Sequence, residues 1–232
     1  MKIITYATHN DGLFEELSKN KEIVVLGFGT KWEGFIGKAK LIYSYLETLN
    51  NDEIVVIVDG FDSIIKNTVI LEKFKSFDCK VLVSMEDKSS LNSFLPSFLH
   101  NYIKLKVFGT CKNGITANSG LCMGYVNYLK TTFNSLINGK SSDDQRNLNS
   151  ACNILPFLKI DTYNKVFENC TSLEEVNNSS ACICQLPGTL SFNRIKRSLV
   201  EYPKFFIPEI IIILLLIILI YGFIKKTSKK SR

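Results

Sequence analysis

Two aspartates, Asp59 and Asp62, directly follow a run of five apolar residues, Ile-Val-Val-Ile-Val at positions 54–58. Valine and isoleucine in such a run favour a buried strand, and ligands in open α/β sheets collect beyond the carboxyl ends of the strands. Two carboxylates on a turn at that point can hold a hard divalent cation, which can neutralise a diphosphate. The pattern Asp-x-x-Asp is also typical of a capped turn, with Asp62 as the N-cap of a helix and Asp59 as a turn residue. The sequence alone leaves both interpretations open.

The segments around this pair alternate between strand and helix patterns. Apolar β-rich runs predict strands, and apolar residues three and four apart predict amphipathic helices. We expect strands at 2–6, 22–27, 53–58 and 80–85, and helices at 13–20, 38–49, 68–77, 91–102 and 125–136. We also expect a tight loop at 118–124 that leads into a short strand or a helix start, and a helix that starts near residue 142. This rhythm predicts an α/β fold with a mostly parallel sheet and helices on its faces.

Composition limits the function classes. The chain has 232 residues, of which 46% are hydrophobic and 22% charged, enough for one sizeable domain with a complete core. The net charge is +6, and Lys225, Lys226, Lys229, Lys230 and Arg232 supply five of these charges, so about +1 remains elsewhere. This charge distribution argues against nucleic acid as a partner.

The seven cysteines do not follow zinc-ligand spacing, and their odd number excludes complete intramolecular pairing. Cys79 and Cys122 lie next to apolar sequence, so we expect buried thiols there. Cys170, Cys182 and Cys184 could pair in an oxidising compartment, which the sequence does not specify.

The C-terminal region has the pattern of a membrane span. The run 210–224 contains no charged residue, and counting from Phe205 gives a helix about 30 Å long, near the hydrocarbon thickness of a bilayer. The alternative, a buried core helix, is disfavoured because isoleucine and leucine cover every face. We therefore expect a globular domain at 1–203, a single-pass transmembrane helix at 204–224 and a basic tail at 225–232.

Two features disagree about which side of the membrane the domain occupies. The basic tail predicts that the C-terminus is cytoplasmic and that the domain lies on the other side. The N-terminal residues, in contrast, show no apolar signal segment of useful length. Both a lumenal domain and a cytosolic, tail-anchored domain stay open.

Six short motifs occur in an order that resembles a known family. They are Tyr-Ala-Thr at 6–8, Leu-Gly-Phe-Gly at 26–29, Val-Asp-Gly-Phe-Asp at 58–62, Ser-Met-Glu at 84–86, Asn-Ser-Gly-Leu-Cys-Met-Gly at 118–124 and Asp-Asp-Gln at 143–145. The order and spacing are similar to those of the glycosyltransferase domain of procollagen lysyl hydroxylases, over about residues 3–208. The resemblance implies a GT-A-type fold, a UDP-sugar donor, Mn²⁺ as cofactor and a protein acceptor of the hydroxylysine, collagen-like kind.

The resemblance also assigns roles to individual residues. Asp59 and Asp62 match the metal and diphosphate aspartates, and Asp143 and Asp144 match an acidic run near the acceptor and the reacting carbon, where a carboxylate could orient or deprotonate the acceptor hydroxyl. The expected donor-binding residues are Thr8, Trp32, Lys40, Phe61, Asn118, Ser119, Gly120 and Asn193. Structural roles are the alternatives for three residues: Asp143 as a helix cap, Trp32 as a core residue and Lys40 as a solvated helix residue.

The sequence departs from the family pattern in three places. Ser191 stands where the family has a metal-binding histidine, and a neutral hydroxyl is a weaker ligand. The glycine-bearing loop after Trp32 is shorter, and the acidic run is reduced to two aspartates. We therefore predict a membrane-anchored glycosyltransferase that uses a UDP-hexose. The alternatives are a catalytically inactive relative that binds a nucleotide-sugar or a partner at the membrane, and a membrane-anchored adaptor without a ligand.

Overall fold

The computed structural model describes residues 1–20, 22–86, 97–187 and 203–230. It divides the chain into two compact units, Met1–Thr189 and Leu190–Arg232. Asn193, a predicted donor-binding residue, and Ser191, which stands in place of the family's histidine, lie outside the described residues.

The first unit is built on a six-stranded sheet with strand order β2-β1-β3-β6-β5-β7. Pairs β1–β2, β1–β3 and β5–β7 are parallel, whereas β6 runs antiparallel to both of its neighbours. The prediction of a mostly parallel sheet is confirmed. The strands are β1 (Lys2–Tyr6), β2 (Ile23–Leu26), β3 (Ile54–Asp59), β5 (Val81–Met85), β6 (Ala117–Tyr125) and β7 (Leu158–Ile160).

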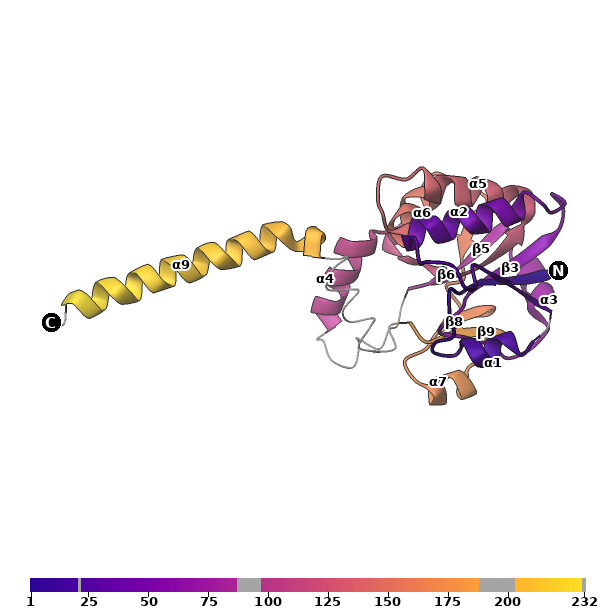
Figure 1. Ribbon diagram of the computed structural model, residues 1–232, viewed down its shortest axis with the longest axis horizontal. Coiled ribbons are helices and arrows are strands. Elements are labelled where there is room, and N and C mark those ends of the chain that lie inside the picture. The colour runs from indigo at the N-terminus through magenta and orange to yellow at the C-terminus, as the bar shows by residue number, and fades with distance from the viewer. Residues whose placement is uncertain (21, 87–96, 188–202, 231–232) are drawn as a thin grey trace. The chain divides into compact units, whose positions relative to one another are not determined.

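Helices and a second sheet cover the two faces of this sheet (Figure 1). One face packs against α2 (Gly34–Leu46), α5 (Val126–Ile137) and α6 (Asp144–Cys152). The other face packs against α1 (Phe14–Ser18), α3 (Ile70–Lys75) and a three-stranded sheet of order β4-β9-β8. Neighbouring residues of the central strand serve opposite faces, since Val55 and Ile57 lie in the first core and Val56 and Val58 in the second.

The small sheet is absent from the sequence prediction. Its strands are β4 (Ser63–Ile65), β8 (Phe167–Asn169) and β9 (Ile183–Gln185). Three-residue strands carry too little periodicity to be recognised, and they form here through pairing between distant parts of the chain. The remaining elements of this unit are α4 (Ser97–Phe108), the 3₁₀ turn η2 (Lys112–Gly114) and α7 (Leu173–Asn178).

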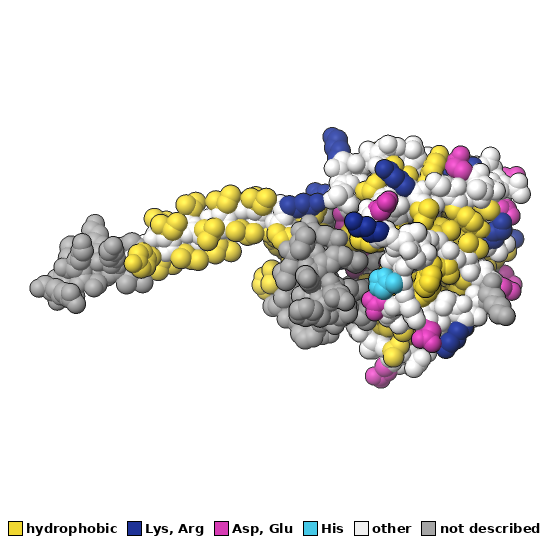
Figure 2. Space-filling view, viewed as in Figure 1, with side chains coloured by type: hydrophobic (Ala, Val, Ile, Leu, Met, Phe, Trp, Pro, Cys, Tyr) yellow, Lys and Arg dark blue, Asp and Glu magenta, His cyan; other side chains and the backbone are white. Residues whose placement is uncertain are grey.

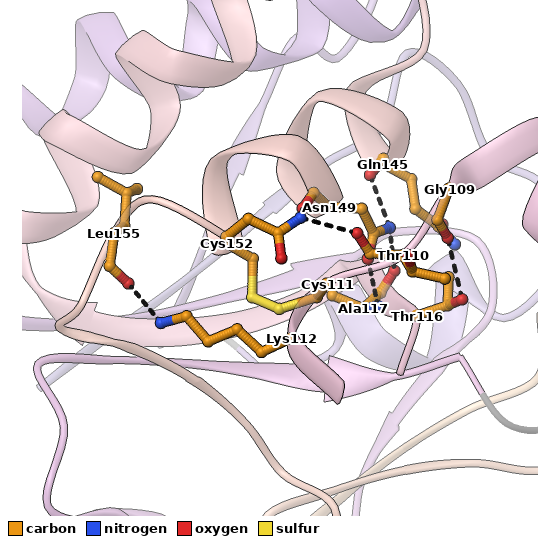
Figure 3. The surroundings of a disulfide bond; sticks show 11 residues. Gly109, Thr110, Cys111, Lys112, Thr116, Ala117, Gln145, Asn149, Cys152 and Leu155 are labelled. Carbon is orange, nitrogen blue, oxygen red and sulfur yellow. Dashed lines mark hydrogen bonds between the residues drawn. A yellow bond between two sulfur atoms is a disulfide. The ribbon is translucent and has the colours of Figure 1, made fainter. Parts of the chain in front are cut away.

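A disulfide joins Cys111, just before η2, to Cys152 at the end of α6 (Figure 3). The same region is tied by Asn149, which accepts a hydrogen bond from the Ala117 amide at 2.7 Å and donates one to the Ala117 carbonyl at 3.1 Å. These contacts hold α6 beside the start of β6.

The second unit contains the turn η3 (Pro203–Phe206) and the helix α9 (Ile207–Lys230). Of the described helices, the span Pro203–Tyr221 is long and apolar enough to cross a membrane, with a mean hydropathy of 2.6 and none of its residues buried. Apolar side chains are exposed along the described surface of α9 (Figure 2). An apolar helix without a buried residue in this span fits a membrane span better than a core helix.

Candidate active site

The site begins where the chain leaves the large sheet for the small one. Asp59 is the last residue of β3 and pairs with Tyr6 of β1, whereas Asp62 directly precedes β4. Gly60 makes the crossing possible, because a Cβ atom there would lie 2.6 Å from the Tyr6 carbonyl oxygen. The alternative interpretation of Asp62 as a helix N-cap is therefore wrong, since a strand follows it.

A buried lysine joins this turn to α6. The Nζ atom of Lys38, on α2, lies 3.8 Å from Asp59 Oδ1 and 3.8 Å from Asp144 Oδ2. The side chains of Lys38 and Asp144 are 8% and 5% exposed, and that of Asp59 is 27% exposed. Burial alone would lower the pKa of Lys38, but Asp59, Asp144 and Asp62 outweigh it, so the pKa lies above its usual value and the ammonium is retained.

Asp144 faces the cluster, whereas Asp143 holds the helix. Burial raises the pKa of Asp144, as does the charge of Asp59, against the opposing effect of Lys38. Ser119 Oγ donates a hydrogen bond to Asp144 Oδ1 at 3.1 Å. Asp143 is the N-cap of α6, and its Oδ1 accepts a hydrogen bond from the Arg146 amide at 2.8 Å. The structure thus supports the capping alternative for Asp143.

Asn118, Ser119 and Gly120 lie within strand β6, so the strand begins where the sequence predicted a tight loop leading into a short strand or helix start. The register of β5 and β6 shifts from Val83↔Cys122 to Ser84↔Asn118, so residues 119–121 bulge away from β5. The bulge directs Ser119 toward Asp144. It also brings Gly120 against the small sheet, where a Cβ atom would lie 2.4 Å from Gln185 Nε2.

Gln185 holds the second aspartate. Its Nε2 donates a hydrogen bond to Asp62 Oδ1 at 3.1 Å, and both side chains are buried. The neighbouring Leu186 amide donates to the Asp62 carbonyl oxygen at 2.8 Å. Asp62 is therefore held in position by Gln185, in strand β9 of the small sheet, and by Leu186, which follows it.

A further buried carboxylate, that of Glu86, adjoins strand β6. Glu86 Oε2 accepts hydrogen bonds from Asn118 Nδ2 at 2.5 Å and Gln145 Nε2 at 3.1 Å. Asn118 also accepts a hydrogen bond from the Gly120 amide at 2.6 Å, so this network sets the shape of the bulge. The expected roles of Asn118 and Gly120 at a donor site are compatible with this placement.

Aromatic rings lie along the turns that follow β1, β2 and β3. The rings of His9 and Phe61 are 5.2 Å apart, and His9 Nδ1 is 2.9 Å from the hydroxyl of the buried Thr8. Trp32 is half-buried, with its ring 5.6 Å from that of Tyr6. Thr8 and Phe61 thus lie together, where flat rings can pack against a base.

Lys40, in contrast, is an exposed residue of α2, and the structure does not bring it to the carboxylates. The buried lysine is Lys38, which the sequence reasoning missed together with Gln185 and Glu86. A signal for Lys38 existed, because it shares the i, i+4, i+8 stripe of the buried Ile42 and Leu46. A lysine on the buried stripe of a helix needs a charged partner.

The residues present are compatible with a divalent cation whose remaining ligands come from a substrate. Among the residues that the structure describes, no three or more His, Cys, Asp or Glu side chains are placed to share a metal ion. Cations of the Mg²⁺ type, however, need only one or two protein carboxylates when substrate phosphates supply other ligands. Lys38 interacts with three carboxylates, those of Asp59, Asp62 and Asp144, so negative charge exceeds positive charge here. An unaided diphosphate would be repelled by that excess.

No family model matches the chain, and no curated protein matches it at a significant level. Among solved structures, a glycosyltransferase involved in the glycosylation of the major capsid of PBCV-1 superposes with a TM-score of 0.52. The alignment covers 84% of this chain and 97% of that chain at 10% sequence identity. This chain has a GT-A-type fold. The galactosyltransferase LgtC, solved with donor and acceptor sugar analogs, gives a TM-score of 0.44 at 11% identity over 82% of this chain and 88% of that chain.

At 10% identity, the likeness to the PBCV-1 enzyme establishes the fold alone. The narrower resemblance to the procollagen lysyl hydroxylase domain stays a prediction.

Proposed function

We propose that this protein is a membrane-anchored glycosyltransferase that transfers a hexose from a UDP-sugar to a protein acceptor, with hydroxylysine of a collagen-like chain as the acceptor class that the resemblance suggests. The observation that carries the proposal is the buried Lys38–Asp59–Asp144 cluster at the carboxyl ends of β1 and β3, where α/β folds bind their ligands. The GT-A-type fold supports it.

In this proposal Asp59 and Asp62 would hold Mn²⁺ together with the donor phosphates. The bound cation would stabilise the charge that develops on the UDP leaving group. Asp59 is the more accessible of the two carboxylates, while Asp62 is fixed by Gln185. Lys38 keeps Asp59 and Asp144 together and contributes a permanent positive charge beside the diphosphate.

Asp144 is the better candidate of the acidic pair for contact with the reacting groups. Its raised pKa suits proton transfer, since a general base works best when its pKa approaches the ambient pH. Asp143 supports this role of Asp144 by capping the N-terminus of α6, the helix that carries Asp144. Thr8 and Phe61 would border the uracil, and Ser119 and Gly120 would lie beneath the donor sugar.

A second candidate function has specific support. Asp143 caps a helix, and Asp144 is bonded to Ser119 and paired with Lys38, so each carboxylate of the acidic pair already has a structural task. This arrangement would suit an inactive relative that binds a nucleotide-sugar without turning it over.

The first experiment measures donor binding by thermal unfolding of the full chain in detergent. UDP with Mn²⁺ at about one hundred times its Kd should stabilise the protein by about 2.7 kcal/mol, which raises Tm by about 5 to 11 °C. Asp62→Ala should abolish this shift. The control is Asp78→Ala. Asp78 is exposed and precedes the N-terminal end of β5, whereas the candidate site lies at the carboxyl ends of the parallel strands. If UDP produces no shift with or without Mn²⁺, only the adaptor interpretation survives.

Turnover separates the two binding functions. An active enzyme should slowly hydrolyse UDP-glucose or UDP-galactose in the presence of Mn²⁺. Binding without release of UDP would support the inactive relative.

A further inference from the structure

Three cysteines gather in and beside the small sheet. Cys111 and Cys152 form the disulfide, and Cys170, Cys182 and Cys184 are fully buried thiols. The proposed transfer reaction does not involve these three thiols.

Two of these thiols share one core, and the third lies in another. Strands β8 and β9 run parallel with Glu168↔Cys184 and Asn169↔Gln185 paired, so Cys170, the next residue, lies on the same face as Cys184. Both lie in one small core, and their thiols are hydrogen-bonded to each other. Cys182 is part of the other core, where its thiol is hydrogen-bonded to Lys73.

The surroundings favour one of the two thiols as a nucleophile. The hydrogen bond from Cys170 lowers the pKa of Cys184 against the effect of burial, with further help from Ser179 and the charge of Lys66. The same contact and burial raise the pKa of Cys170. Lys66 is held in place because its Nζ donates to the carbonyl oxygens of Val176 and Ser179.

We propose that Cys170 and Cys184 form a second disulfide of this protein, made by exchange with a disulfide oxidant such as oxidised glutathione or a protein disulfide. The Cys184 thiolate attacks the oxidant and displaces one thiolate, which gives a mixed disulfide. Cys170 then loses its proton and attacks the Cys184 sulfur, which releases the second thiolate. The two cysteines are oxidised by two electrons, and the oxidant is reduced to two thiols.

This bond would act on the candidate active site. Cys184 directly precedes Gln185, whose side chain holds Asp62, and the Cys170 amide donates to the Gln185 carbonyl oxygen at 2.7 Å. A covalent link between Cys170 and Cys184 therefore fixes β9 at the residue that positions a candidate metal ligand.

The test follows both disulfides in one sample. The full-length chain, purified in detergent under reducing conditions, is treated with oxidised glutathione in mild denaturant until mass spectrometry of an unreduced digest shows Cys111 linked to Cys152. We expect a Cys170–Cys184 cross-link in the same digest, with Cys79, Cys122 and Cys182 alkylated as free thiols. The proposal is overturned if Cys170 and Cys184 are alkylated while Cys111–Cys152 is linked, or if either pairs with Cys182.

Stability provides the second readout, with a matched control. Closing the loop between residues 170 and 184 should raise the Tm of the oxidised protein by about 6 to 12 °C relative to Cys170→Ser. Reduction should cancel this difference. Cys182→Ser removes a buried thiol directly before β9 and should keep the redox-dependent shift. Neither the cross-link nor the Tm measurement requires a bound UDP-sugar or sugar transfer, so the result is independent of the proposed function.

Discussion

Lys38 is the residue whose removal tests the site most directly. Replacing it with methionine keeps most of the side-chain volume but leaves Asp144 buried and Asp59 partly buried without their cation. Removing one partner of a buried ion pair costs about 3 to 5 kcal/mol, because the remaining charge loses its compensation. For a chain of this size, Lys38→Met should lower Tm by about 6 to 20 °C at pH 7.5.

The loss should depend on pH in a defined direction. The pKa of Asp144 is already raised by burial, and Lys38 is the group that opposes this effect, so the variant should raise it further. A carboxyl group whose folded pKa exceeds its unfolded pKa binds more protons in the folded state. Stability then falls as pH rises through the interval between the two values. Lys38→Met should therefore be less destabilised at pH 5 than at pH 7.5.

Differential scanning calorimetry of the wild type and the variant at the two pH values measures both effects. Lys40→Met is the matched control, because Lys40 is exposed on the same helix and its replacement should change stability by about 0.5 kcal/mol or less. The double variant Lys38→Met/Asp144→Asn should recover part of the loss. Equal stability of Lys38→Met and wild type, or a larger loss at pH 5, would refute the buried charge cluster.

Two further predictions concern the carboxylate pair and the strand bulge. Asp143→Ala should cost about 1 kcal/mol of stability through loss of the helix cap. Asp144→Asn should reduce turnover much more than Asp143→Ala does, because Asp144 faces the charge cluster. Urea unfolding measures stability and UDP release measures turnover, and equal losses of turnover in the two variants would contradict the division of roles. Gly120→Ala places a Cβ atom 2.4 Å from Gln185 Nε2, and the flexible amide can move aside, so stability should fall by about 1 kcal/mol. The shift of Tm by UDP and Mn²⁺ should nevertheless shrink, because Gln185 loses its hydrogen bond to Asp62; an unchanged shift would show that this bond does not organise donor binding.

Local patterns were sufficient for the elements that they control. The apolar run 54–58 predicts the central strand and places Asp59 at its end, and the helical periodicity of residues 125–136 predicts α5, observed at Val126–Ile137. The acidic residues near 142 predict the start of α6, with Asp143 observed as its cap. The apolar segment that follows residue 203 predicts a helix of spanning length. Each of these features depends on residues a few positions apart, so the sequence contains the whole signal.

Partners distant in sequence were decided only by the tertiary structure. Lys38 meets Asp144 because α2 and α6 pack on one face of the sheet, and Gln185 meets Asp62 because β9 pairs with β4. The three-residue strands of the small sheet and the bulge at Ser119 depend on register between segments, which no local periodicity specifies. The sequence therefore determined which chemical groups stand at the end of the central strand. The fold decided that a buried ammonium, and not the neighbouring Lys40, would join them.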